Sequence, residues 1–91
     1  MPKIFEFGRY VFFFWSAENG EPIHVHVAVK TPSEHSSKIW LTRAGGCLLA
    51  NNDADIPARD LHKILTIVIA NHSLICRKWR EYFDEPPTFF C

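Results

Sequence analysis

The sequence predicts a single α+β domain, in which a four-stranded, mainly antiparallel β-meander packs on one long or kinked C-terminal helix. Three observations predict this class: a two-residue apolar period in the first half, a 3.6-residue period in the second half, and turn residues between the expected strands. We expect the sheet over about residues 9–50 and the helix over about residues 57–83. A chain of 91 residues leaves no room for a second domain, so residues 1–91 form one unit.

Four strands are expected in the first half of the chain. The first is aromatic and β-branched throughout, which is typical of a strand that is apolar on both faces. The next two alternate between apolar and polar residues, as strands with one buried face do. Turn dipeptides such as Asn19-Gly20 and Gly45-Gly46 separate the strands. The expected strands cover residues 10–15, 23–30, 38–42 and 47–50.

The alternation divides the side chains of the second and third strands between two faces of the sheet. Val25, Val27 and Val29 share one face, which we expect to form the core against the helix together with Ile39 and Leu41. One side of the aromatic strand must join the opposite face. The polar and aromatic residues on that opposite face are His24, His26, Lys38 and Trp40.

The C-terminal half carries apolar residues at helical spacing, with Asp55 as the expected N-cap. A continuous helix over 27 residues would be about 40 Å long. A compact chain of this size has a diameter of about 30 Å. The helix therefore overhangs or breaks. The favoured break is Asn71-His72-Ser73, because Asn and Ser are poor interior residues and good caps.

Composition and charge exclude several classes of protein. Ten Lys and Arg balance ten Asp and Glu, so no chain-wide charge supports bulk binding of nucleic acid or a membrane surface. Three cysteines without CxxC spacing argue against a disulfide framework and against a cysteine-rich zinc fold. The longest apolar run is too short to cross a bilayer and the N-terminus lacks a signal-peptide pattern, so a cytoplasmic protein is expected.

The pattern His24-x-His26 is the sharpest chemical feature. Residues i and i+2 of a strand point the same way, about 6–7 Å apart. Such an imidazole pair is inert and hydrogen-bonded, divides acid and base work, or binds a metal. A metal site needs three or four ligands, and none of the further candidates has diagnostic spacing, so we expect no metal and no other cofactor. Those further candidates are Glu21, His35 and Cys47.

The residues around the histidines extend this chemistry. Glu18 and Glu21 lie in the preceding loop, where a carboxylate orients an imidazole, acts as a base, or is simply exposed. Lys38 and Trp40 are suited to contact a phosphate and to stack on a base. The competing interpretation is that another protein chain covers this face, because a bare aromatic patch is a liability.

Two blocks of the sequence carry a family resemblance: residues 21–26, which read Glu-Pro-Ile-His-Val-His, and residues 38–41, which read Lys-Ile-Trp-Leu. Together with residues 2–4, the aromatic strand and its turn, and residues 79–83, they make the chain similar to the small bacterial proteins catalogued as domain of unknown function 4160. The resemblance implies one half of a two-gene module and the role of a toxin in a toxin–antitoxin system. Many members carry a further histidine where this chain has Gly20, which disfavours a three-histidine metal site. The positions that match the family motif are Glu18, Glu21, His24, His26, Lys38 and Trp40.

The leading hypothesis is a toxin-like protein that acts on RNA or DNA without a bound metal. In it His24 and His26 are the acid–base pair, and replacing either is expected to change stability by no more than roughly 1 kcal/mol. The alternative is a non-enzymatic interaction module whose aromatic sheet face forms a homodimer or binds a partner. Under both hypotheses we expect a homodimer or a complex with a small antitoxin-like protein, because the long helix and the aromatic strand leave apolar surface uncovered.

Overall fold

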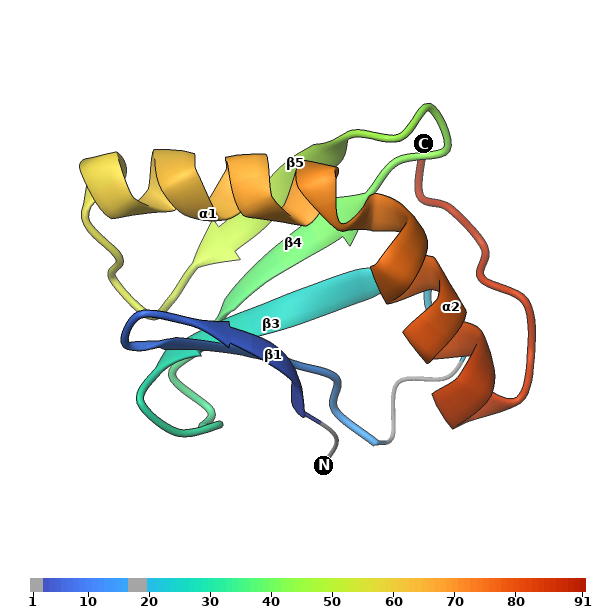
Figure 1. The fold of residues 1–91 in the computed structure, drawn as a ribbon, viewed down its shortest axis with the longest axis horizontal. Helices are drawn as coiled ribbons and strands as arrows, with labels where there is room; N and C mark the ends of the chain where they lie inside the picture. Colours follow the sequence, from blue (N-terminus) through green and yellow to red (C-terminus); the bar gives the residue numbers. More distant parts are fainter. Residues whose placement is uncertain (1–2, 17–19) are drawn as a thin grey trace.

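The computed structural model describes residues 3–16 and 20–91. Within these residues, five strands form one antiparallel sheet in the order β1-β2-β3-β4-β5, and two helices follow (Figure 1). The α+β class and the antiparallel meander are confirmed, and the predicted number of strands was too low by one. The elements are β1 (Lys3–Phe7), β2 (Tyr10–Phe13), β3 (His24–Val29), β4 (Ser37–Leu41), β5 (Cys47–Asn52), α1 (Ala58–Ala70) and α2 (His72–Phe83).

β1 is the strand that the sequence analysis missed. It pairs with β2 after a turn at Gly8, whose φ of +58° lies in the left-handed region that favours glycine. The ring of Phe5 packs on that of Phe12 with centroids 4.6 Å apart, so the strand adds to the apolar core. Its sequence signal is only the five residues before Gly8, which precede a more strongly aromatic run at residues 10–15.

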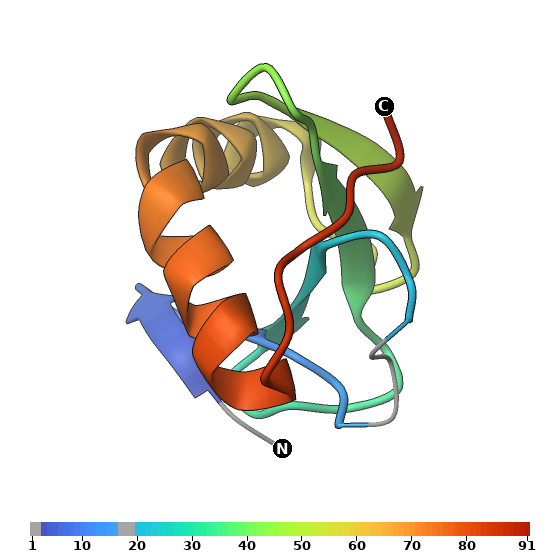
Figure 2. The same ribbon diagram turned by 90° about the vertical axis from the view of Figure 1, so that its right-hand side faces the viewer.

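The predicted C-terminal helix is broken. Residues 58–83, all of them described, form two helices that meet at Asn71, whose φ of −111° ends the first. The Asn71 side chain donates to the Ile67 carbonyl at 2.9 Å and so closes the last turn of α1. The break lies where it was predicted, and both helices cover the same face of the sheet (Figures 1 and 2). The N-cap prediction was wrong: Pro57 occupies that position, and Asp55 adopts a φ of +55° in the turn before it.

The hydrophobic core lies between the sheet and the two helices. The predicted core side chains of β3 and β4 are fully buried there, except Val29, which is exposed at the end of its strand. Burial of apolar side chains of this kind is the main favourable term in folding. The core residues from the two helices are Ile64, Val68, Ile75 and Trp79.

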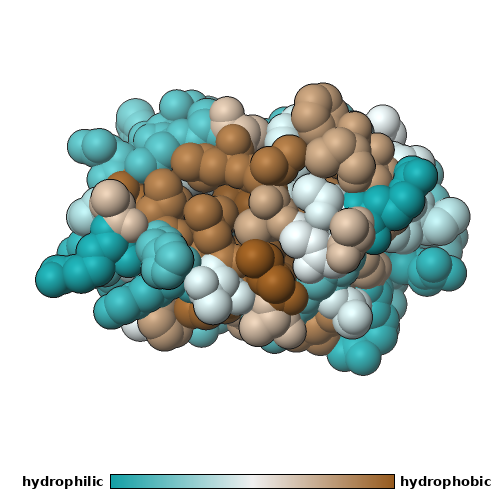
Figure 3. Space-filling view, turned by 90° about the horizontal axis from the view of Figure 1, so that it is seen from above, coloured by the Kyte–Doolittle hydropathy of each residue, from teal (hydrophilic) through white to brown (hydrophobic). Residues whose placement is uncertain are grey.

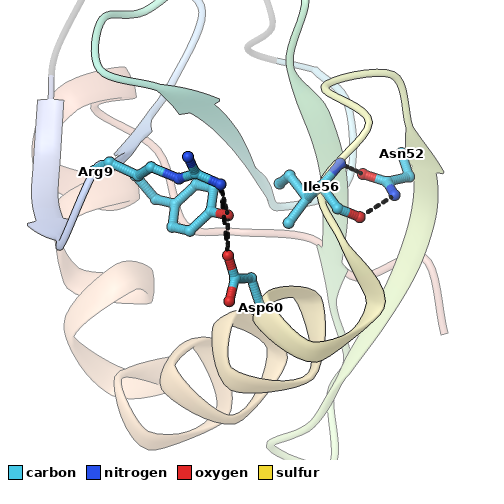
Figure 4. A network of polar contacts seen from close by, with 5 residues as sticks. Arg9, Asn52, Ile56 and Asp60 are labelled. Carbon is cyan, nitrogen blue, oxygen red and sulfur yellow. Dashed lines mark hydrogen bonds and ion pairs between the residues drawn. The ribbon is translucent and has the colours of Figure 1, made fainter.

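Asn52 holds the turn between β5 and α1 (Figure 4). Its Oδ1 accepts from the Ile56 N–H at 3.1 Å and from the Ser37 hydroxyl at 2.6 Å, and its Nδ2 donates to the Ile56 carbonyl at 3.0 Å. We expect Asn52→Ala to lower the free energy of unfolding by about 1–3 kcal/mol, because it leaves these partly buried groups without their partner. Urea denaturation measures this, and the neighbouring Asn51→Ala is the control. Equal losses in the two variants would contradict the assignment.

Asp60 joins the first turn of α1 to β2 (Figure 4). The Tyr10 hydroxyl donates to its Oδ2 at 2.5 Å, and the Arg9 guanidinium lies 3.7 Å from the same oxygen. The hydrogen bond from Tyr10, and then the charge of Arg9, hold the pKa of the Asp60 carboxyl below its ordinary value, against the opposing effect of desolvation. The folded state therefore prefers Asp60 ionised.

This preference predicts a pH dependence. A lowered folded pKa contributes stability above the ordinary Asp pKa of about 3.9, and that contribution is lost as the pH falls through the folded pKa. Asp60→Asn should therefore be less stable than the wild type near neutral pH, and the difference should shrink below about pH 4. Urea titrations across this range, with the exposed Asp53→Asn as control, make the measurement. A difference that stays constant with pH would contradict the role given to the carboxylate.

Candidate functional site

The four predicted strand residues come together on the sheet face that points away from the helices. His24 is the register partner of Trp40, and His26 is that of Lys38. On the other side of β3, Phe13 of β2 is paired with His26. We call this surface the histidine face and define it by His24, His26, Lys38 and Trp40, with Phe13 and Trp15 at its border.

The side chains of the histidine face are in mutual contact. The two imidazole centroids lie 5.0 Å apart with their planes nearly perpendicular, and His24 meets the Trp40 ring edge-on at 5.5 Å. The Lys38 ammonium lies 4.3 Å from the centroid of the Trp40 ring, which is a cation–π distance. One site therefore holds two titratable rings, a positive charge and an indole.

The predicted carboxylate Glu21 reaches this site through Lys38. Its Oε1 lies 2.9 Å from the Lys38 Nζ, and the lysine side chain is 19% exposed while that of the glutamate is 42% exposed. A partly exposed ion pair of this kind is worth little net stability, so the lysine can exchange it for another anion at low cost. Glu18, the other predicted carboxylate, lies outside the described residues.

The two histidines are buried, contrary to the small, surface-like change in stability that the sequence predicted for replacing them. His24 is 1% exposed and His26 is 7% exposed. Trp15, from the connection after β2, lies edge-on to His26 at 6.0 Å, and Trp79 of α2 contacts His24 at 5.5 Å at the end of the sheet. The chain's own segments therefore cover the two imidazoles, while Lys38 and Trp40 are partly exposed. Alanine in place of either histidine should cost more than the surface-like value first expected, because it leaves a cavity.

Hydrogen bonding assigns the tautomer of His24. Its Nδ1 lies 2.9 Å from the Pro22 carbonyl oxygen, which can only accept, so Nδ1 carries the hydrogen. In the neutral ring the basic lone pair is then on Nε2. His26 differs, because its Nδ1 lies 3.2 Å from the Ser36 hydroxyl, which donates or accepts. The position of the hydrogen is thus assigned on the first ring, while the second ring can carry a proton on either nitrogen.

A second cluster, His72 and Cys76 on α2, was not singled out from the sequence, although its i, i+4 spacing was visible. The His72 Nε2 donates to the Thr42 carbonyl at 2.7 Å, and the Cys76 Sγ lies 3.7 Å from its Nδ1. Burial raises the pKa of the Cys76 thiol, which opposes the thiolate that nucleophilic chemistry needs. We therefore assign the pair a structural role, in which it fastens α2 to the β4–β5 hairpin.

The candidate metal ligands do not gather. Across residues 3–16 and 20–91, no group of three His, Cys, Asp or Glu side chains is placed to hold a metal ion. Cys47 lies away from the histidines, with its Sγ 3.6 Å from the Leu65 carbonyl of α1, and His35 is exposed in the loop before β4. Within the same residues, no helix has the length and apolar character to cross a membrane.

Comparison with known proteins places the chain in a family without naming an activity. The search of curated proteins and the search of solved structures gave no match. The family described as "Domain of unknown function (DUF4160)" matches residues 9–80. That span includes β2 to β5, α1, most of α2 and every residue of the histidine face. The chain therefore belongs to the DUF4160 family.

Proposed function

We propose that this protein is a toxin-like ribonuclease that binds single-stranded RNA at the histidine face. The observation that supports this most is the convergence of an imidazole pair, an ammonium group and an indole on one site, with contacts of 4.3–5.5 Å. Imidazoles supply acid and base near neutral pH, lysine neutralises phosphate charge, and an indole stacks on bases. RNA is favoured over DNA because its 2′-hydroxyl provides a nucleophile next to the phosphate.

The proposed reaction transfers two protons. In this reaction the segments that cover the imidazoles open, His24 takes the proton of the 2′-hydroxyl, and the 2′-oxygen attacks the adjacent phosphorus. The bond from phosphorus to the 5′-oxygen breaks, and His26 as the imidazolium protonates that leaving oxygen. The products are a 2′,3′-cyclic phosphate and a free 5′-hydroxyl. Lys38 leaves Glu21 to stabilise the charge that develops on the phosphate, while Trp40 stacks on the neighbouring base.

Growth and cleavage assays test the proposal. We expect the chain expressed alone to arrest bacterial growth, and co-expression of the small protein encoded by the neighbouring gene to restore it. Purified protein stripped of metal should cleave single-stranded RNA in the presence of a chelator and leave the DNA of the same sequence intact. Normal growth together with intact RNA would contradict the proposal.

A second candidate function is self-association without catalysis, and a specific surface favours it. Apolar residues form a continuous area over α1 and β5 (Figure 3). Leu49, the register partner of the core residue Ile39, is exposed on β5, which is the edge strand of the sheet, and Ile69 is exposed on α1. Leu65, on the same flank of α1 by helical spacing, has its carbonyl 3.6 Å from the Cys47 Sγ, which places this flank beside the strand.

The partner proposed for this surface is a second copy of the chain. β5 contains neither charged residues nor proline, so it lacks two of the devices that keep edge strands from pairing. Arg43 precedes β5 in the chain, and Asp53 and Asp55 follow it. If two copies of β5 paired antiparallel, Arg43 of each copy would lie near the two aspartates of the other, and these opposite charges would attract. The bulge in β5 shortens the pairing and leaves the apolar side chains to supply the rest of the contact.

Light scattering at micromolar concentration tests this interface. We expect a particle of twice the 10.5 kDa of one chain, which Leu49→Lys converts to a monomer. Thr66→Lys, an exposed change on another side of α1, should leave the dimer intact. A wild-type particle of 10.5 kDa would contradict self-association and leave the ribonuclease proposal untouched.

A further inference from the structure

We propose that the C-terminal tail, residues 84–91, is an intramolecular strap whose last two residues cover the stacking surface of Trp40 and must lift for RNA to bind. This inference rests on the proposed function and adds its regulation. The tail begins at Asp84, where a φ of +55° ends α2 and turns the chain back. It then runs past the beginning of β3 and the end of β4 toward the β4–β5 hairpin (Figures 1 and 2).

Backbone hydrogen bonds hold the strap at two points. The Ile23 N–H donates to the Thr88 carbonyl at 2.8 Å, and the Arg43 N–H donates to the Cys91 carbonyl at 2.9 Å. The first point is at a fully buried residue, whereas the second is at an exposed residue of the hairpin. Opening is easiest where backbone hydrogen bonds are exposed and apolar contacts are few. The segment that moves is therefore Phe90 and Cys91, because Phe89 packs against the core and lies parallel to the His72 ring at 6.2 Å.

Phe90 occupies the place proposed for a base. Its ring lies parallel to the Trp40 indole, with centroids 5.1 Å apart and an interplanar angle of 11°. This is the geometry in which aromatic side chains stack on nucleobases. A base and the phenyl ring cannot occupy the same position on the indole. Phe90 is also 60% exposed, so its stacking on Trp40 adds little to the core.

The strap also closes a cavity beside the histidine face. This cavity, of about 300 Å³, lies between Glu21 and the tail, with Trp79 in its lining. Trp79 contacts His24, and Glu21 binds Lys38, so the cavity adjoins both sides of the proposed site. Glu85 lines the same cavity from the tail and opposes the approach of a phosphate by its charge. The strap thus excludes RNA by occupying the indole, while the fixed part of the tail opposes the phosphate with the charge of Glu85.

Binding of a short single-stranded RNA tests the strap. The probe carries 2′-O-methyl groups, which prevent cleavage, and a fluorophore for anisotropy. Phe90→Ala should bind it about 2- to 12-fold more tightly than the wild type, the factor that corresponds to the strength of an aromatic pair. Phe90→Tyr keeps the ring and should bind like the wild type. Hydrogen exchange at the Arg43 amide should accelerate in Phe90→Ala, and in the wild type when the RNA is added.

The outcomes separate the strap from the function. If the RNA binds wild type and Phe90→Ala equally while exchange at Arg43 is faster in the variant, the tail does not compete and the strap is wrong, although the RNA site stands. If no variant binds RNA although faster hydrogen exchange at the Arg43 amide shows that the tail is released, the proposed function is wrong. The proposed regulation is then wrong as well. Tighter binding by Phe90→Ala that is lost when Trp40→Leu is added supports both.

Discussion

Replacing Trp79 by alanine is expected to lower the free energy of unfolding by about 3–5 kcal/mol. Trp79 is 1% exposed on α2 and packs against Phe14 at 5.2 Å and Phe83 at 4.3 Å. Its ring also contacts His24, so it supports the core and the histidine face together. Truncation removes the largest buried side chain and leaves a cavity that the neighbouring rings cannot fill without shifting.

The adjacent residue provides the control for this change. Arg80 is exposed on the same helix, and Arg80→Ala should alter the free energy of unfolding by no more than about 0.5 kcal/mol. Urea denaturation of both variants measures the difference. A Trp79 variant as stable as the Arg80 variant would show that α2 does not close the core as described.

Replacing His26 by glutamine is expected to slow RNA cleavage by a factor of about 10²–10⁴, which is the usual contribution of general acid–base catalysis. Glutamine is chosen because its amide can still bond the Ser36 hydroxyl that lies 3.2 Å from the His26 Nδ1, while it cannot transfer a proton near neutral pH. His62→Gln, an exposed histidine on α1, is the matched control and should cleave like the wild type. Single-turnover cleavage of one labelled RNA by the three proteins makes the comparison.

The burial of His26 requires that folding be measured beside activity. A cleavage rate that falls only in proportion to the unfolded fraction would assign the histidine a structural role. A well-folded His26→Gln protein with the wild-type rate would contradict its part in catalysis. A folded His26→Gln protein that cleaves RNA at the expected lower rate would separate catalysis from stability. An alanine variant would not separate them, because His26 is only 7% exposed and its truncation leaves a cavity.

The division of the β3 side chains between the two sheet faces could be predicted, because it depends on local periodicity alone. Val25 and Val27 alternate with His24 and His26, and the structure places the first pair in the core and the second on the opposite face. The break at Asn71 could also be predicted, because one continuous helix would be longer than a compact chain of this size is wide. β1 was missed because its five residues mix charged and apolar side chains directly before the more strongly apolar β2.

The burial of the site could not be read from the sequence, because it depends on contacts between distant segments. His26 is covered by Trp15 and Ser36, and His24 by Trp79, from three different parts of the chain. Sequence periodicity does not predict such contacts, because the side chains of loops do not alternate regularly between two faces. The stacking of Phe90 on Trp40 could not be predicted either, because it also joins distant segments. The prolines of the tail predict only that the helix ends before them.

RNA is proposed to bind at the histidine face and not at the exposed basic residues of α2, which are Arg77, Lys78 and Arg80. The most direct measurement is NMR chemical-shift mapping of the labelled protein during titration with the 2′-O-methyl RNA. We expect the largest shifts at His24, His26, Lys38 and Trp40, together with Phe90, which stacks on Trp40. Shifts concentrated instead on the exposed Arg77, Lys78 and Arg80 would contradict it.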